Sequence, residues 1–148
     1  MIDGRFPKET LYNIGVKAVI LNKDKQILLL NITRKNSTET YWDLPGGRIA
    51  DGETQEDTLR REVEEETGIT ELSIERHLTM VTSRVRLPIF DDKKVGVIFS
   101  VYVCLSGSKT EQPEERITMH WCSKSEAVAN LKSNPDWPAE VIDRIAEI

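Results

Sequence analysis

Three glutamates within one short stretch have the types and the spacing to bind a metal ion. Glu62, Glu65 and Glu66 are spaced i, i+3 and i+4, so on a helix they share one face. Glu62 and Glu66 have no basic residue three or four positions away, and like charges at that spacing cost roughly 0.2–0.5 kcal/mol per pair. A divalent cation would offset that cost, because Mg²⁺ binds through oxygen ligands and often carries substrate phosphates. The alternative is a solvated, charge-rich helix without a ligand.

The residues around these glutamates predict a helix of about 13 residues, roughly 20 Å long. Thr54 can serve as its N-cap, with Asp57 three residues later to complete a capping box. Gly68 falls where a left-handed C-terminal cap would lie. Leu59 and Val63 form the apolar stripe that should face the core, which leaves the three glutamates at the edge of the buried face.

Two arginines on the same helix have acidic residues four positions further on. We therefore expect Arg60 to pair with Glu64 and Arg61 to pair with Glu65. These pairs leave Glu62 and Glu66 as the carboxylates without a helical partner.

The wider stretch, residues 47–69, follows the pattern G-x5-E-x7-R-E-U-x-E-E-x-G-U, where U is an aliphatic residue. With each residue type at about 6% frequency, a chance match has odds below about one in a million. The stretch resembles the signature of the Nudix hydrolase family, the MutT-like proteins. The resemblance implies an α/β fold, namely an α/β/α sandwich with a mixed β-sheet, formed by a single domain over residues 1–148.

The resemblance also implies a reaction and a cofactor. Nudix hydrolases cleave the pyrophosphate of a nucleoside diphosphate linked to a further group X, and they use Mg²⁺ or Mn²⁺. By position, Glu62, Glu65 and Glu66 match the metal ligands, and the backbone carbonyl at Gly47 often joins them. A metal there would lower the pKa of a bound water and stabilise charge on phosphoryl oxygens.

Three further residues are candidates for catalytic roles through the same resemblance. Arg61 is expected to orient a glutamate through a charge-assisted hydrogen bond. Glu53 would orient a metal ligand or join the metal cluster. The general base would come from the signature or from a later loop, which offers Glu111, Glu114 and Glu115; Glu115 lies six residues before Trp121, a placement common in small members of the family.

The substrate is less closely defined by the sequence. The first expectation is a (deoxy)nucleoside triphosphate, oxidised forms included, and the alternatives are ADP-ribose, a nucleotide sugar, or a non-catalytic nucleotide-binding regulatory module. Arg84, Arg86 and the loop at residues 34–35 could hold a phosphate or a ribose, although such residues are more often surface cations. Trp42 could stack on a base, and core packing is the alternative for it and for Trp121.

The rest of the chain predicts strands on both sides of the signature helix and two helices after them. We expect strands at Gly15–Leu21, Gln26–Asn31, from Leu72 to Met80 or Val85, Val95–Leu105 and Ile117–Cys122. Loops are expected at 33–40, 41–47, 86–94 and 106–116, and a tail or short edge segment at 1–13. One helix should be capped by Ser123 and end at Leu131, and another should start at Asp136-Trp137-Pro138.

Bulk properties limit the classes of partner. The chain has 148 residues and a net charge of −5, which argues against long nucleic acid but not against a small nucleotide substrate. Its two cysteines do not make a disulfide framework. No signal-peptide core or membrane-spanning run is present in the sequence, so we expect a cytoplasmic protein with no membrane partner. Many members of the family are homodimers, and the sequence is compatible with that state.

Overall fold

The computed structural model describes residues 11–90, 93–107, 110–111 and 114–148, and for residues 87–90 and 93–94 it describes the backbone only. Its elements are β1 (Tyr12–Leu21), β2 (Ile27–Thr33), β3 (Thr40–Asp43), β4 (Gly46–Arg48), α1 (Gln55–Thr67), β5 (Ser73–Phe90), β6 (Lys93–Leu105), β7 (Ile117–Cys122), α2 (Lys124–Lys132) and α3 (Ala139–Ala146).

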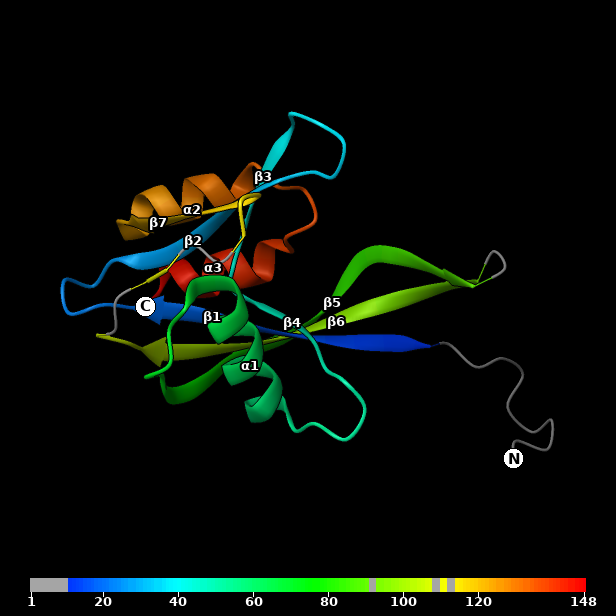
Figure 1. The fold of residues 1–148 in the computed structure, drawn as a ribbon, viewed down its shortest axis with the longest axis horizontal. Coiled ribbons are helices and arrows are strands. Elements are labelled where there is room, and N and C mark those ends of the chain that lie inside the picture. Colours follow the sequence, from blue (N-terminus) through cyan, green and yellow to red (C-terminus); the bar gives the residue numbers. More distant parts are fainter. Residues whose placement is uncertain (1–10, 91–92, 108–109, 112–113) are drawn as a thin grey trace.

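The strands form one mixed sheet with β1 near its centre (Figure 1). The main path runs β3-β2-β1-β6-β5, while β4 pairs with β1 and β7 pairs with β2. β1 and β6 are parallel, and the other pairs are antiparallel. This arrangement confirms the predicted mixed sheet.

Helices cover both faces of the sheet, so the core has two parts. On one face, Leu59 and Val63 of α1 pack with Ala18 and Ile20 of β1. On the other face, α2 and α3 pack against alternate residues of the same strand, such as Val19. Successive residues of a strand point to opposite faces, which explains why the whole middle of β1 is buried. The predicted α/β/α sandwich is confirmed.

Local sequence signals place α1 as expected. The Thr54 hydroxyl accepts from the backbone N–H of Asp57, and the Asp57 carboxylate accepts from the N–H of Thr54. Gly68 ends the helix in the left-handed conformation, with φ of 77°. The capping box at Ser123 is likewise confirmed for α2.

Three expectations about loops and termini were wrong. Part of the predicted loop at 41–47 forms β3 and β4, because β2 and β1 supply their pairing partners. Of the predicted loop at 86–94, residues 86–90 are the end of β5 and residues 93–94 are the start of β6, while residues 91–92 lie outside the described part of the chain. Pro88 is tolerated in β5 because β5 is an edge strand. β1 begins at Tyr12, inside the predicted tail, because it pairs in parallel with β6.

The last helix also begins later than the sequence predicted. Residues Asn134 to Trp137 form a turn in which Asn134 Oδ1 accepts from the N–H of Asp136, and the Asn134 carbonyl accepts from Trp137. Pro138 then occupies the N-cap position of α3, and the helix starts at Ala139. This turn places Trp137 against the sheet, where it lines the cleft described below.

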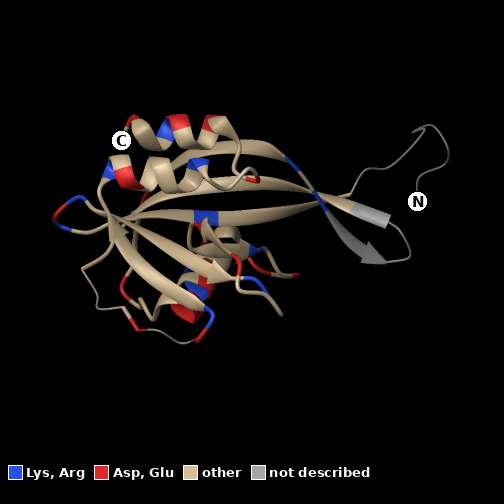
Figure 2. Cartoon of the chain, turned by 90° about the horizontal axis from the view of Figure 1, so that it is seen from above, with Lys and Arg blue, Asp and Glu red and all other residues tan. Residues whose placement is uncertain are grey.

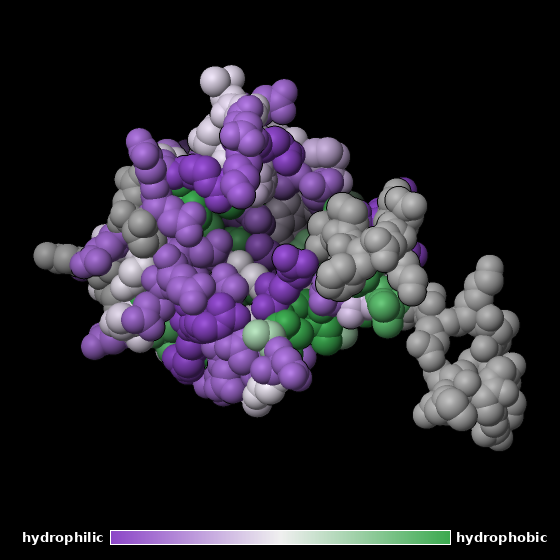
Figure 3. All heavy atoms as spheres, turned by 45° about the vertical axis from the view of Figure 1, so that its right-hand side comes forward, coloured by the Kyte–Doolittle hydropathy of each residue, from purple (hydrophilic) through white to green (hydrophobic). Residues whose placement is uncertain are grey.

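Charge is concentrated on helices and loops, while the strands carry few charged residues (Figure 2). The surface shown in Figure 3 is mainly hydrophilic, with limited apolar patches. Among the described residues, the large exposed hydrophobic side chains are Leu11, Tyr12, Met80 and Leu105. In the described part of the chain, none of the helices has the length and apolar character needed to cross a membrane.

Candidate active site

α1 directs two of its glutamates at the backbone of β4. The N–H of Gly46 donates to Glu66 Oε1 at 2.8 Å. The Glu62 carboxyl group lies so close to Gly47 that a Cβ at that position would collide with it. β4 is held in place by its pairing with β1, opposite Val16 and Lys17. The two carboxylates therefore lie against the Gly46–Gly47 backbone.

Gly46 must be a glycine for a related reason. Its φ is +139°, and a Cβ there would overlap the Val16 carbonyl oxygen and approach the Cα of Lys17. Only glycine adopts this conformation readily. The close approach lets β4 lie between β1 and the carboxylates of α1.

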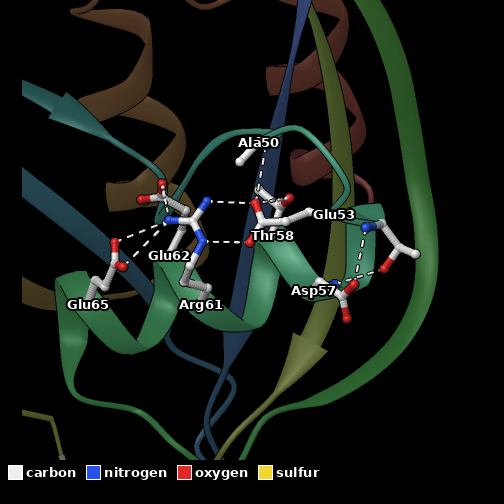
Figure 4. Close-up of polar contacts among 8 residues, drawn as sticks. Ala50, Glu53, Asp57, Thr58, Arg61, Glu62 and Glu65 are labelled. Carbon is white, nitrogen blue, oxygen red and sulfur yellow. Dashed lines mark hydrogen bonds and ion pairs between the residues drawn. The ribbon is translucent and has the colours of Figure 1, made fainter.

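Arg61 connects three glutamates (Figure 4). It donates to Glu53 from Nε to Oε2 at 2.7 Å and from Nη2 to Oε1 at 2.8 Å. Its Nη1 donates to Glu62 Oε1 at 2.9 Å and to Glu65 Oε2 at 3.3 Å. Glu53 is fixed further by the Thr58 hydroxyl at 3.0 Å and the Ala50 N–H at 3.1 Å. The network holds the carboxylates of Glu62 and Glu65 in defined positions.

These contacts affect the ionisation of Glu53 and Arg61. Hydrogen bonds from Arg61, helped by Thr58 and the Ala50 N–H, lower the pKa of Glu53 to about 2. Hydrogen bonds to Glu53 and Glu62 raise the pKa of Arg61 above its usual range. Both groups are therefore charged throughout the neutral range, and the ion pair persists there.

Glu66 has the opposite tendency. Burial raises its pKa to about 7, against the opposing effects of the Lys17 cation and the Gly46 N–H, and the carboxylates of Asp43 and Glu62 add to the rise. A cation beside Glu66 would relieve this unfavourable environment. The charged form of the buried Glu66 carboxylate would therefore be stabilised by a cation bound next to it.

Lys17 supplies part of that positive charge from the sheet. Its Nζ donates to Asp43 Oδ2 and to the Leu44 carbonyl, each at 3.2 Å. Burial opposes the charge of Lys17, but Asp43 and Glu66 outweigh it and raise the pKa of the lysine above its ordinary value. This pair was not predicted from the sequence, although Lys17 is a lone charged residue in an otherwise apolar strand and could have pointed to it.

A cleft of about 460 Å³ opens beside these groups. It brings together the end of β4 with Glu62, the Lys17–Asp43 pair, and aromatic residues from three parts of the chain. Its lining residues are Gly15, Lys17, Tyr41, Asp43, Gly47, Arg48, Glu62, Val85, Val97, Phe99, Asn134, Asp136 and Trp137. The cleft joins a carboxylate-rich edge to an apolar wall, a combination suited to a ligand with both phosphates and a ring.

The donors fit a hard divalent cation. Among the described residues, no three acidic, histidine or cysteine groups converge into a ready-made metal site. Mg²⁺ does not need a closed protein site, since it usually binds one or two carboxylates together with waters and substrate phosphates. Glu62 and Glu66, with the Gly47 carbonyl, could supply such ligands, and a bound cation would stabilise the charged form of Glu66, whose pKa burial raises.

Two of the other predicted catalytic residues, Glu65 and Glu115, are exposed to solvent. The side chain of Glu65 is 58% exposed and is held by Arg61, on the outer side of the cluster. Glu115 is exposed in the turn before β7 and forms no hydrogen bond or ion pair within the part of the chain that is described. The Arg60–Glu64 pair was predicted wrongly, because Arg60 bonds to Glu56 and to the Leu72 carbonyl instead.

The predicted substrate-binding residues do not line this cleft. Arg84 lines a neighbouring hollow next to α3, and the Arg86 guanidinium lies 5.6 Å from the ring centroid of Tyr12. Trp42 packs against the core under α2 and α3, edge-on to His120. Arg34 comes nearer, because it stacks at 4.6 Å on Tyr41, which does line the cleft.

Comparison with known proteins gives the family to which this mixed sheet between helices, with its capped helix α1 set against the glycines of β4, belongs. Residues 11–145 match the NUDIX domain family, and the chain belongs to that family. Among solved structures it is similar to a MutT protein from Methanosarcina mazei Go1, with a TM-score of 0.69, 27% identity, and coverage of 95% of this chain and 94% of that one.

Curated relatives fall into more than one substrate class. A putative 8-oxo-dGTP diphosphatase of Bacillus subtilis is 43% identical over 39% of this chain and 36% of its own length. An ADP-ribose pyrophosphatase of the same organism is 31% identical over 73% of this chain and 57% of its own length. A MutT-like protein of Streptomyces ambofaciens is 27% identical over 93% of this chain and 72% of its own length. The chain thus spans only about a third to a little over half of the first two relatives.

Proposed function

We propose that the protein is a metal-dependent pyrophosphohydrolase that cleaves the pyrophosphate of a nucleoside diphosphate linked to a group X. The observation that carries the proposal is the placement of Glu62 and Glu66 against Gly46 and Gly47, with Arg61 holding the cluster beside the cleft. Members of the NUDIX domain family generally use divalent metal ions, and we propose Mg²⁺ or Mn²⁺ for this one.

The residues have separate proposed tasks. Glu62, Glu66 and Glu65, with the Gly47 carbonyl, would hold the metal, which when bound neutralises phosphate charge and acidifies a water. Arg61, itself held by Glu53, keeps Glu62 and Glu65 in place through the hydrogen bonds described above, and the Gly46 N–H holds Glu66. Arg48, exposed at the edge of the cleft beside Gly47, is placed to meet a phosphate.

The proposed substrate is a (deoxy)nucleoside triphosphate, oxidised forms included. The similarity to a putative 8-oxo-dGTP diphosphatase supports it. The second candidate is ADP-ribose or a nucleotide sugar, which the longer match to an ADP-ribose pyrophosphatase favours. The products separate them: a triphosphate releases inorganic pyrophosphate, whereas ADP-ribose yields two monophosphates.

The testing experiment is a substrate panel with and without Mg²⁺, read out by phosphate-containing products. The panel holds nucleoside triphosphates, 8-oxo-dGTP, ADP-ribose, nucleotide sugars and dinucleoside polyphosphates. Turnover of one class that stops when the metal is removed supports the proposal and names the substrate. No turnover by folded, Mg²⁺-binding protein would favour the regulatory, non-catalytic alternative.

Glu115 is retained as a proposed general base on the resemblance alone. A loss of about 10² or more in kcat for Glu115→Gln would assign Glu115 a role at the site. Wild-type kinetics would mean that Glu115 is a solvent-exposed turn residue without a role in the reaction. A cytoplasmic location and a homodimer stay predictions, to be tested by cell fractionation and analytical ultracentrifugation.

A further inference from the structure

A buried lysine lies beside the two-residue connection, Leu44-Pro45, that joins β3 to β4. Lys17 is the one charged residue in the sequence of β1, and its side chain is 11% exposed. Its Nζ donates to Asp43 Oδ2 and to the Leu44 carbonyl, each at 3.2 Å. Burying a charge is costly, and a buried ion pair often adds little net stability. The presence of a lysine at this position is therefore poorly explained by fold stability alone.

The Leu44-Pro45 connection takes its position from β1. Both residues are buried. The Pro45 carbonyl accepts from the N–H of Ala18 at 2.8 Å, and the Leu44 carbonyl accepts from the ammonium of Lys17. The N–H of Leu44 donates to Asp43 Oδ1 at 2.8 Å, so Lys17 also fixes the connection through the carboxylate that it binds. Two neighbouring residues of β1 thus hold both carbonyls, one through its backbone and one through its side chain.

The connection leads directly to the backbone group that holds a proposed metal ligand. The Gly46 N–H donates to Glu66 Oε1 at 2.8 Å. Gly46 is the pairing partner of Lys17 between β4 and β1, and a Cβ on Gly46 would lie 3.0 Å from Lys17 Cδ. The stem of the lysine therefore runs along Gly46 before its ammonium reaches the connection. A shift of the connection would move the Gly46 N–H, and Gly47 with it.

A lysine has the chemistry that this placement needs. An ammonium group has several N–H donors, so it can bind a carboxylate and a carbonyl at the same time. Hydrogen bonds from a charged donor are stronger than those between neutral groups. The long stem of Lys17 carries the charge from β1 across Gly46 to the Leu44 carbonyl. The side chain thus ties the segment before the site to the centre of the sheet.

We propose that Lys17 is a positioning residue for the proposed hydrolysis, because its ammonium fixes the backbone of Gly46 and Gly47 against the carboxylates of α1. The inference rests on the proposed function, since the placement of Glu62 and Glu66 matters to the reaction only if they bind the metal. Lys17 acts through the Leu44-Pro45 connection rather than on the substrate.

The first test measures the placement of Gly46 without metal or substrate. Amide hydrogen exchange of the full chain in EDTA, followed by NMR, measures how readily the Gly46 N–H leaves Glu66. Lys17→Met keeps a stem beside Gly46 and removes the donors. Exchange at Gly46 should quicken at least about tenfold more than exchange at the most protected amides of the sheet, which report global unfolding. A change at Gly46 that only matches those amides would overturn the proposal.

The second test is the affinity of the free protein for Mn²⁺, measured by the electron paramagnetic resonance of the unbound ion. Loss of a residue that positions metal ligands should weaken binding by about 10- to 100-fold in Lys17→Met. Removal of a positive charge would by itself strengthen cation binding, so the two explanations predict opposite changes. Equal or tighter Mn²⁺ binding by folded Lys17→Met would contradict the positioning role.

The double variant Lys17→Met/Asp43→Asn separates placement from stability. It removes the carboxylate charge that Lys17→Met leaves without its partner, so it should unfold at a higher urea concentration than the single variant. The Leu44 carbonyl still lacks its donor, so Mn²⁺ should bind as weakly as in Lys17→Met. If the single variant does not fold, the double variant decides. Mn²⁺ affinity that returns to the wild-type value together with stability would overturn the proposal.

Ser106→Ala is the matched control. The buried Ser106 side chain also binds a backbone carbonyl, that of Glu71 at 2.9 Å, but it does not line the cleft. The variant should lose stability and keep the wild-type Mn²⁺ affinity, with exchange at Gly46 changing no more than at the most protected amides. Faster exchange at Gly46 in Lys17→Met, without Mn²⁺ binding by the wild type, would refute the proposed metal site and keep the placement by Lys17. Mn²⁺ binding and turnover that Lys17→Met leaves unchanged would refute this inference alone.

Discussion

The guanidinium of Arg61 binds the carboxylate of Glu53 through two parallel hydrogen bonds of 2.7 and 2.8 Å, across eight residues of sequence. Its remaining nitrogen reaches Glu62 at 2.9 Å. A planar guanidinium matches a carboxylate in this two-bond geometry, which a lysine ammonium cannot reproduce. Arg61 therefore couples the loop before α1 to Glu62 and Glu65, two of the carboxylates that we propose as metal ligands.

Arg61→Lys should lower kcat by about 10- to 100-fold and raise the Mg²⁺ concentration needed for half-maximal rate, because partners that orient metal ligands have effects of this size. The charge is kept, so the thermal unfolding midpoint should change little. Steady-state kinetics over a Mg²⁺ titration measure both effects. Arg60→Lys is the control, since Arg60 contacts Glu56 and the Leu72 carbonyl rather than the cluster. An unaltered Mg²⁺ dependence in Arg61→Lys would contradict the positioning role.

Gly47→Ala should separate activity from stability. The added Cβ would meet the end of the flexible Glu62 side chain, so Glu62 can move aside at a small cost in unfolding free energy while leaving its place at the site. We expect kcat to fall at least about tenfold. Gly46→Ala should instead destabilise the fold by more than about 1 kcal/mol, because its Cβ meets backbone atoms of β1 at φ of +139°. Urea unfolding and steady-state kinetics of both variants check this contrast. Full activity in Gly47→Ala would contradict the proposed role of Glu62 as a metal ligand.

Glu65→Gln should keep the fold and lower kcat by about 10² or more, if charge at the metal site stabilises the transition state as we propose. The side chain is isosteric and 58% exposed, so its loss of charge should scarcely alter stability. Glu64→Gln, one residue earlier and outside the Arg61 network, should turn over like the wild type. Equal rates for the two variants would withdraw Glu65 from the proposed ligands.

The sequence predicted α1 well because the signals that define it are local. A capping box, a C-terminal glycine and an apolar stripe act within a few residues of one another. The shared face of Glu62, Glu65 and Glu66 follows from helix geometry alone. The same reasoning was wrong for Arg60, because its partners lie one turn earlier, at Glu56, and beyond the end of the helix, at Leu72.

The parts that sequence reasoning missed depend on tertiary contacts. Arg61 finds Glu53 because the loop after β4 folds back over the first turn of α1, which helical spacing does not describe. Lys17 becomes buried only where Asp43 and Trp137 pack against β1. The strand ends at 86–90 and 93–94 form because each supplies the other with a pairing partner. Pairing of this kind outweighs the local preference for a loop.

The elevated pKa of Glu66 makes the stability of the metal-free protein depend on pH. Burial raises this pKa from 4.5 to about 7, so the folded state holds a proton that the unfolded state releases between these values. Stability from this group is fully present below pH 4.5 and is lost as pH rises through about 7. Glu53 acts in the opposite direction at lower pH, because its pKa of about 2 means that its contribution is lost as pH falls below 4.5.

In EDTA, the wild-type free energy of unfolding should therefore decrease between pH 5 and pH 8, by an amount on the order of 2–4 kcal/mol. Urea denaturation at several pH values measures it. Glu66→Gln should flatten the curve, since the amide oxygen can still accept from Gly46 N–H without any charge to bury. Glu64→Gln should keep the wild-type slope, and the histidines, present in all three proteins, cancel from the comparison. Parallel curves for the wild type and Glu66→Gln would mean that Glu66 is ionised at no cost in the fold, which would remove the reason to expect a cation beside it.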